Sequence, residues 1–138
     1  MAAVNAESGW LWFAFKDPRV LPGRVLWMEN GGRHSPPWNG RNVCLGIEDG
    51  CMNFDLGLAA SCRPNALSRR GIPTCAVLSG KRPFEIRYVQ GVARVPAGFD
   101  RVCAVRFSPG AASFRSVRGQ DAQVQVAHEF VFSESQGQ

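Results

Sequence analysis

The stretch VCAVRFSPGAASFRSV, from Val102 to Val117, predicts two β-strands joined by a turn. Val102, Ala104 and Arg106 are expected to face one way, and Cys103, Val105 and Phe107 the other, which is the period of two that a strand requires. Ser108-Pro109-Gly110 interrupts this period, and the pattern resumes from Ser113 to Val117. This stretch therefore predicts consecutive antiparallel strands.

Similar patterns occur on both sides of this stretch. Further strands are predicted at Gly9–Phe15 (GWLWFAF), Arg24–Glu29, Asn42–Ile47, Ile72–Leu78, Phe84–Tyr88 and Gln123–Phe132. The segment from Asp49 to Arg70 is less regular, and it predicts a short helix near Phe54–Ala60, capped by Asn53 or Asp55. Short strands separated by turn residues indicate an all-β chain, an antiparallel β-sandwich or barrel, with at most one or two short helices.

The length of 138 residues favours one domain with a core of its own. We expect a single β-sandwich domain over residues 9–132, with a disordered N-terminus over residues 1–8 and a disordered polar tail over residues 133–138. The GWLWFAF strand has large apolar groups on both faces, so we expect it to be buried in a sheet or in a subunit contact.

The formal net charge of +5 comes from arginines scattered along the chain, and only Arg69 and Arg70 are adjacent. This pattern lacks the clustered basic stripe of a nucleic-acid-binding protein, so nucleic acid is an unlikely partner. The first residues contain no basic segment followed by an apolar run, so we expect no signal peptide, and since no apolar run reaches membrane-spanning length we expect no membrane partner.

The five cysteines contain no CxxC pair, which argues against a zinc site, and we expect neither a metal nor a cofactor. Free thiols in a cytoplasmic protein fit this pattern, each cysteine being a small buried hydrophobe. The sequence also lacks a Ser/His/Asp arrangement, a phosphate-binding GxxxxGK[ST] loop and a GxGxxG motif.

The segment NGGRHSPPWNGRNVCLGIE, Asn30 to Glu48, carries the candidate chemistry. Its Gly- and Pro-rich part predicts a loop, which then leads into an apolar strand ending on Glu48. Partial desolvation at a strand end raises the pKa of a carboxyl group, which suits a catalytic general base near neutral pH. The alternatives are that Glu48 caps a turn or pairs with Arg41.

The same loop offers candidate substrate-binding residues. Trp38 can stack on the apolar face of a sugar ring, or it can pack over the loop as a lid. Arg33 and Arg41 can fork onto ligand oxygens. His34 can donate a hydrogen bond or a proton to a ligand, or it can be an exposed loop histidine. Asn39, next to Trp38, is the last substrate-binding candidate.

With these residues in view, residues 10–95 resemble the C-terminal part of the galactose mutarotase-like (aldose 1-epimerase) family. The resemblance is carried by GGRHSPPWNGR, CLGIE, CRPNALSRRGIP, LSGK and FEIRYVQGV, in this order. It implies a partial β-supersandwich, with Glu48 in the place of the glutamate that takes the proton from the anomeric hydroxyl of a sugar. The family's acidic histidine and sugar-holding arginine come from an earlier segment that this chain lacks, and His34 lies in the wrong part of the pattern to replace that histidine.

Two functions follow from this resemblance and from the composition. In the first, the chain is a truncated sugar-site domain that binds a small-molecule sugar and has little or no mutarotase activity alone; if it is active, it is an aldose 1-epimerase-like isomerase. In the second, it is a non-catalytic β-sandwich module that homodimerises or docks on a partner polypeptide, because half a sandwich leaves an apolar face uncovered. A weaker third possibility is binding of an acidic polymer through the excess of arginine.

Overall fold

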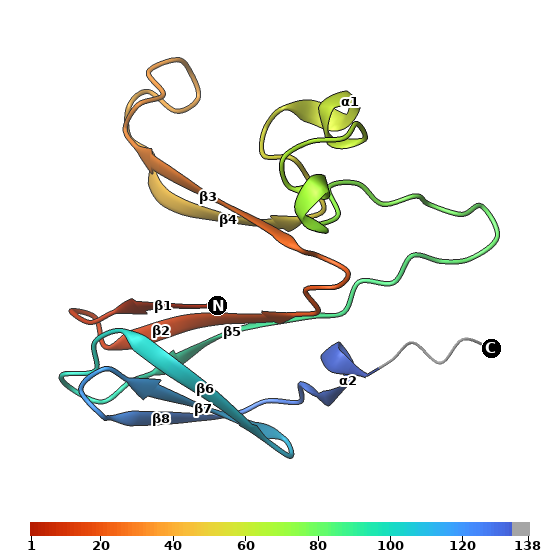
Figure 1. Ribbon diagram of the computed structural model, residues 1–138. Helices are drawn as coiled ribbons and strands as arrows, with labels where there is room; N and C mark the ends of the chain where they lie inside the picture. The colour runs from red at the N-terminus through yellow and green to blue at the C-terminus, as the bar shows by residue number, and fades with distance from the viewer. Residues whose placement is uncertain (134–138) are drawn as a thin grey trace. The chain divides into compact units, whose positions relative to one another are not determined.

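The computed structural model describes residues 1–133, and it divides the chain into two compact units (Figure 1). The terminal unit consists of residues 1–17 together with the chain from residue 87 onward, and the central unit consists of residues 18–86. Within the described residues, eight strands form three antiparallel sheets, accompanied by two short α-helices and one 3-10 turn. The predicted predominance of β-structure is therefore confirmed.

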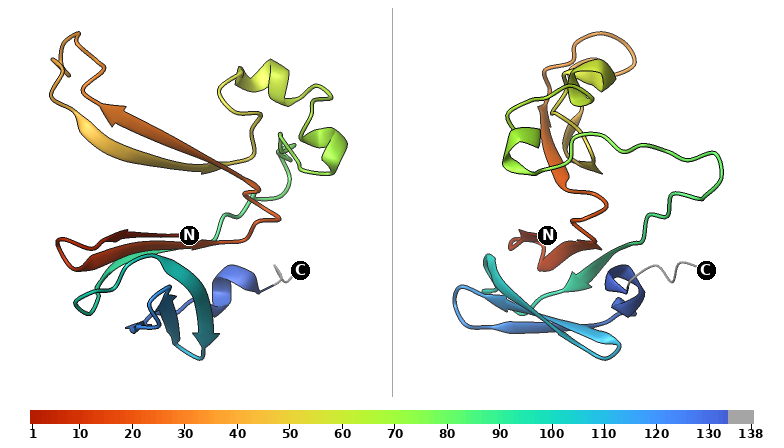
Figure 2. Two further views of the ribbon diagram at one scale, coloured as in Figure 1. Left: turned by 60° about the vertical axis from the view of Figure 1, so that its left-hand side comes forward. Right: turned by 45° about the vertical axis from the view of Figure 1, so that its right-hand side comes forward.

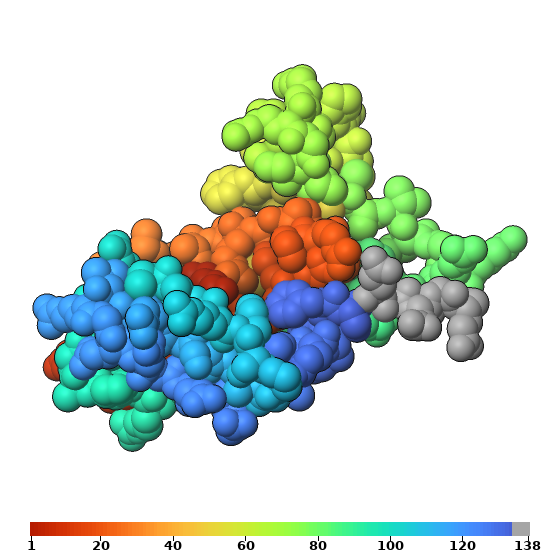
Figure 3. Space-filling model, turned by 60° about the horizontal axis from the view of Figure 1, so that its bottom comes forward, coloured from red at the N-terminus to blue at the C-terminus, as the bar shows by residue number. Residues whose placement is uncertain are grey.

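The terminal unit contains two three-stranded antiparallel sheets. The first has the strand order β1-β2-β5, formed by β1 (Ala2–Asn5), β2 (Trp10–Lys16) and β5 (Tyr88–Arg94). The second has the order β6-β7-β8, formed by β6 (Val102–Ser108), β7 (Ala111–Ser116) and β8 (Asp121–Gln125). The short helix α2 (Glu129–Phe132) follows, and the space-filling view in Figure 3 shows the side chains of β6–β8, in cyan to blue, lying beside it.

One apolar core joins the two sheets of the terminal unit. Leu11, Phe13 and Phe15 of β2 alternate along the strand and point to the same face. They pack with buried side chains of the second sheet, of the β5–β6 connection and of α2, namely Ala112, Phe114, Ala122, Phe99 and Val131. The ring centroids of Phe13 and Phe114 lie 5.2 Å apart, within the range of favourable aromatic pairs. The expected burial of GWLWFAF is confirmed on this face.

The central unit is organised by one long hairpin. Strands β3 (Gly23–Asn30) and β4 (Val43–Gly50) pair along their whole length, from Gly23 opposite Gly50 to Asn30 opposite Val43. The loop of residues 31–42 closes one end of this hairpin. As Figures 1 and 2 show, α1 (Gly57–Ser61) and the 3-10 turn η1 (Ser68–Arg70) follow at the other end.

Several predicted elements are wrong in detail. Residues 72–78 and 84–87 contain no regular strand, and Pro73 and Pro83 interrupt these segments by lacking a backbone donor. The predicted strand over residues 123–132 ends at Gln125, and residues 129–132 form α2 instead. The short helix α1 exists, but Leu56 is its N-cap residue and makes no side-chain cap.

The two ends of the chain, both predicted to be disordered, have different outcomes. Residues 2–5, expected to be disordered, form β1, because this segment pairs with residues 10–13 of β2. The predicted tail lies, apart from Ser133, outside the described residues. The single β-sandwich domain over residues 9–132 stays a prediction, and the structure shows the two units that such a domain would combine.

Candidate functional site

The loop of residues 31–42 is folded by its own backbone. The Gly31 amide donates to the Asn42 carbonyl at 2.9 Å, which closes the loop above the last strand pair. The Gly40 amide donates to the Arg33 carbonyl at 2.8 Å. Asn39 adopts a positive φ of 51°, a conformation that asparagine tolerates better than most residues. The predicted irregular loop is therefore confirmed, and it holds a defined conformation.

Arg33 is the centre of the side-chain arrangement at this end of the hairpin. Its guanidinium carbon lies 4.6 Å from the ring centroid of Trp27 and 5.5 Å from that of Trp38. Both distances are within the range of cation–π attraction. The buried carboxylate of Glu29 accepts a hydrogen bond from the Arg33 backbone amide at 3.2 Å, and its Oε2 lies 3.7 Å from Arg33 Nε. The carboxylate thus fixes the arginine between the loop and β3.

All five predicted substrate-binding residues lie in this loop. Trp38 is 40% exposed, and His34, Asn39 and Arg41 of the same loop are also exposed. The His34 ring lies close to Gly40, where an added Cβ would be 3.2 Å from Nδ1. An exposed aromatic ring beside a guanidinium group can stack on a sugar ring, and polar side chains of the same loop can bond the sugar hydroxyls. We call Trp27, Arg33, His34, Trp38, Asn39 and Arg41 the loop platform.

Glu48 does not join the loop platform. It lies inside β4 opposite Val25, five positions from Val43, where the loop ends. At about 3.3 Å per residue, this separation is roughly 16 Å along the strand. The prediction that Glu48 ends its strand is wrong, because β4 continues to Gly50. Since Arg41 belongs to the loop, the same separation argues against its pairing with Glu48, and the strand position argues against a turn cap.

Sequence reasoning missed a polar hollow on the second sheet of the terminal unit. Its volume is about 600 Å³, and it is lined by Arg106, Phe107, Ser108, Ser113, Arg115, Asp121 and Gln123. The strand register explains the grouping, because Arg106 lies opposite Ser113, and Ser113 lies opposite Gln123. The alternation of these polar residues along three neighbouring strands was the available signal.

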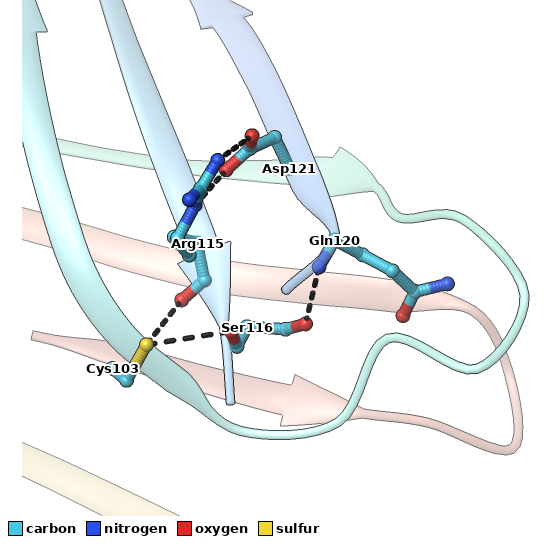
Figure 4. A network of polar contacts seen from close by, with 5 residues as sticks. All are labelled: Cys103, Arg115, Ser116, Gln120 and Asp121. Atoms are coloured by element: carbon cyan, nitrogen blue, oxygen red, sulfur yellow. Dashed lines mark hydrogen bonds and ion pairs between the residues drawn. The ribbon is translucent and has the colours of Figure 1, made fainter. Parts of the chain in front are cut away.

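The polar contacts beside this hollow hold the β7–β8 hairpin (Figure 4). Arg115 forks onto Asp121, with Nε donating to Oδ1 at 2.9 Å, and this hydrogen bond lowers the pKa of Asp121 and raises that of Arg115. The Gln120 amide donates to Ser116 Oγ at 3.0 Å, and the Cys103 thiol donates to the Ser116 carbonyl at 3.3 Å. Because Asp121 is already paired with Arg115, we assign these contacts to stabilising the hairpin rather than to binding a ligand.

Comparison of the chain with protein-family models, with curated proteins and with solved structures finds no match. Among residues 1–133, no group of three or more His, Cys, Asp or Glu side chains is arranged to hold a metal ion. The described part of the chain also contains no helix long and apolar enough to cross a membrane.

Proposed function

We propose that this chain is a carbohydrate-binding protein that contacts a small sugar through the loop platform. The observation that carries the proposal is the stack of Arg33 with Trp27 and Trp38. The buried Glu29 carboxylate contacts Arg33 and holds it in this stack. A prearranged aromatic and cationic surface loses little side-chain entropy when a ligand binds. The resemblance of residues 10–95 to galactose mutarotase-like proteins, and hence a related sandwich fold, is part of the same proposal.

We further propose that the chain alone has little or no mutarotase activity. Ring opening of a sugar requires an acid and a base on one substrate. Glu48 lies about 16 Å along β4 from the loop that carries His34, a distance that exceeds one sugar ring. Binding and proton transfer are therefore separated on the hairpin. All five cysteines are free and none is buried, so the prediction that each is a small buried hydrophobe is wrong, while the free thiols support the proposed cytoplasmic setting.

A titration of glucose and of galactose into the full chain, followed by two-dimensional amide NMR, tests the proposal. We expect saturable shifts of the amides of residues 31–42. The Kd should lie in the millimolar range, which corresponds to a binding free energy on the order of −4 kcal/mol. Trp38→Ala should weaken this binding by about tenfold or more, because an aromatic stacking contact is lost.

The control variant for this titration is Trp10→Ala, which removes an indole from the terminal unit. It should leave the affinity unchanged. Absence of shifts in the loop, or a loss of affinity in Trp10→Ala equal to that in Trp38→Ala, would contradict the proposed site. Polarimetry on the same samples should show anomer interconversion at the uncatalysed rate, and a faster rate abolished by Glu48→Gln would overturn the inactive assignment.

The opposite face of the hairpin supports association as a second function. Leu26, Met28, Val43 and Leu45 share one face of β3–β4 and are all exposed, and Met28 retains 80% of its surface. A two-stranded ribbon is marginally stable alone and gains from further covering. Arg24 and Asp49, on the same face, pair with each other at 2.7 Å. The face is thus apolar with its charges matched, and it complements a second copy of itself in a twofold homodimer.

Size-exclusion chromatography with light scattering tests this second function. We expect a dimer at micromolar concentration that dissociates in Met28→Glu, since the substitution places a charge on the apolar face. The control Glu48→Gln, on the other face of the same ribbon, should stay dimeric. A monomeric wild-type chain would exclude the homodimer, and capture of a different polypeptide by the same face would assign the surface to a partner chain instead.

A further inference from the structure

Three cysteines from separate segments of the central unit converge near Ser61. This serine is buried at the end of α1, and its Oγ accepts a hydrogen bond from the Asn53 amide at 3.0 Å. Its carbonyl accepts a hydrogen bond from the buried Thr74 hydroxyl at 2.7 Å. These two bonds tie the segments that carry Cys51 and Cys75 to the residue that precedes Cys62. These contacts hold together the chain segments that carry the three cysteines.

Cys62 and Cys75 line the same hollow, which has a volume of about 420 Å³. Ser68, Arg63 and Arg69 contribute to its lining. The hollow is kept open by Asn65, whose side-chain amide donates to Thr74 Oγ1 at 2.8 Å and whose Oδ1 accepts from the amides of Leu67 and Ser68. A small polar or anionic molecule thus has access to both sulfur atoms beside two guanidinium groups.

The two thiols in this hollow interact with each other. The Cys62 thiol lies within hydrogen-bonding reach of Cys75. Desolvation, followed by this hydrogen bond, raises the pKa of Cys62, so Cys62 stays the protonated partner. The pKa of Cys51 is also raised, by desolvation and then by the charge of Cys75, which places Cys51 in the same cluster. This hydrogen bond places the two sulfur atoms close enough for thiol–disulfide exchange between them.

We propose that Cys62 and Cys75 form a reversible dithiol–disulfide couple that exchanges with low-molecular-weight disulfides of the glutathione class. In the first step, the Cys75 thiolate attacks one sulfur of the small disulfide, and one small thiolate leaves. In the second step, Cys62, after losing its proton to solvent, attacks the mixed disulfide and releases the second small thiolate. The protein loses two electrons and two protons, and the small disulfide is reduced to two thiols.

The test uses the full chain equilibrated in mixtures of reduced and oxidised glutathione, alkylated, digested with trypsin and analysed by mass spectrometry without reduction. Cleavage at arginine and lysine leaves Cys75 alone in peptide 71–81, whereas Cys44, Cys51 and Cys62 remain together in peptide 42–69. We expect a disulfide between these two peptides, at least tenfold more abundant than any link to peptide 102–106, which carries Cys103.

Single substitutions then assign the partner. The link should disappear in Cys62→Ser and in Cys75→Ser, and it should persist in Cys44→Ser and Cys51→Ser. In Cys62→Ser, Cys75 should instead accumulate a mixed disulfide with glutathione. A link that persists in Cys62→Ser would overturn the pairing, and so would wild-type protein in which Cys75 carries only glutathione. Circular dichroism of each variant confirms that the serine replacements leave the fold unchanged.

Discussion

The terminal unit buries phenylalanines between its two sheets, whereas the central unit buries mainly polar side chains. Among residues 18–86, the buried positions are Leu21, Glu29, Ser61 and Thr74, so only one is apolar. In the terminal unit, Phe13, Phe15 and Phe114 belong to one continuous core. Apolar burial supplies most of the folding free energy, whereas buried polar side chains fix the positions of chain segments more than they add to stability. We infer that the terminal unit supplies most of the stability, and the proposed ligand site lies in the central unit.

Removing a core ring should have the largest effect and test this assignment directly. Phe114 has no exposed surface, and its ring centroid lies 5.2 Å from that of Phe13. Phe114→Ala should lower the free energy of unfolding by about 3–5 kcal/mol, since it leaves a cavity. The comparison variant Val77→Ala, at a position of the central unit that is 94% exposed, should change it by about 0.5 kcal/mol or less. Urea denaturation measures both, and equal effects would break the comparison.

Matched glycines sharpen the same comparison. In each unit a glycine lies across a strand pair from an aromatic ring, Gly91 opposite Phe13 and Gly46 opposite Trp27. A Cβ at Gly91 would lie 2.7 Å from the buried Phe13 ring, while one at Gly46 would lie 3.1 Å from the half-buried Trp27 ring. Gly91→Ala should therefore cost about 1–3 kcal/mol of unfolding free energy, because the Phe13 ring cannot yield.

Gly46→Ala should cost less than Gly91→Ala, because the Trp27 ring has solvent on one side into which it can shift. Thermal unfolding of the two variants side by side provides the measurement. A larger destabilisation by Gly46→Ala would show that the central hairpin is packed as tightly as the core of the terminal unit.

The smallest expected effect is a pH dependence that arises in the terminal unit. Hydrogen bonds from the backbone amides of Gly110, of Glu129 itself and of His128 lower the pKa of Glu129 from 4.5 to about 2. Its contribution to stability is thus fully present above pH 4.5 and is lost as the pH falls towards 2, where the folded carboxylate takes up a proton.

Glu129→Gln should therefore flatten the fall in stability between these pH values, while the surface control Glu7→Gln should leave it in place. Urea midpoints at several pH values in this window provide the measurement. An unchanged slope in Glu129→Gln would show that the hydrogen bonds at this carboxylate do not persist in solution.

The strands that pair with a neighbour were largely predictable from sequence, whereas residues 72–78 and 84–87 show strand patterns but form no strand. Residues 10–15 form a strand whose apolar face lies in the core, and residues 102–107 form a strand that pairs with β7. Phe84 and Ile86 alternate equally well, but no partner strand pairs with them in the described chain, and both remain exposed. Periodicity records a preference of the side chains, whereas a strand requires a neighbour to complete its hydrogen bonds.

The candidate site was predictable only in part for a related reason. The residues of the loop platform lie close together in sequence, so their proximity followed from the chain itself. Glu48 is also near in sequence, but an extended strand carries it away from the loop. The cysteine cluster shows the opposite case, because Cys62 and Cys75 are separated by 13 positions and meet through bonds to Ser61 that no local pattern reveals.

Native-state hydrogen exchange tests the division between a stable terminal unit and a coreless central unit most directly. We predict that the amides of β7, such as that of Phe114, exchange only through global unfolding. Amides of β3 and β4 that lie in hydrogen-bonded pairs, such as those of Val25 and Glu48, should exchange through local opening at a free energy lower by about 2 kcal/mol or more. Equal protection of the two sets, with one shared opening free energy, would contradict this account.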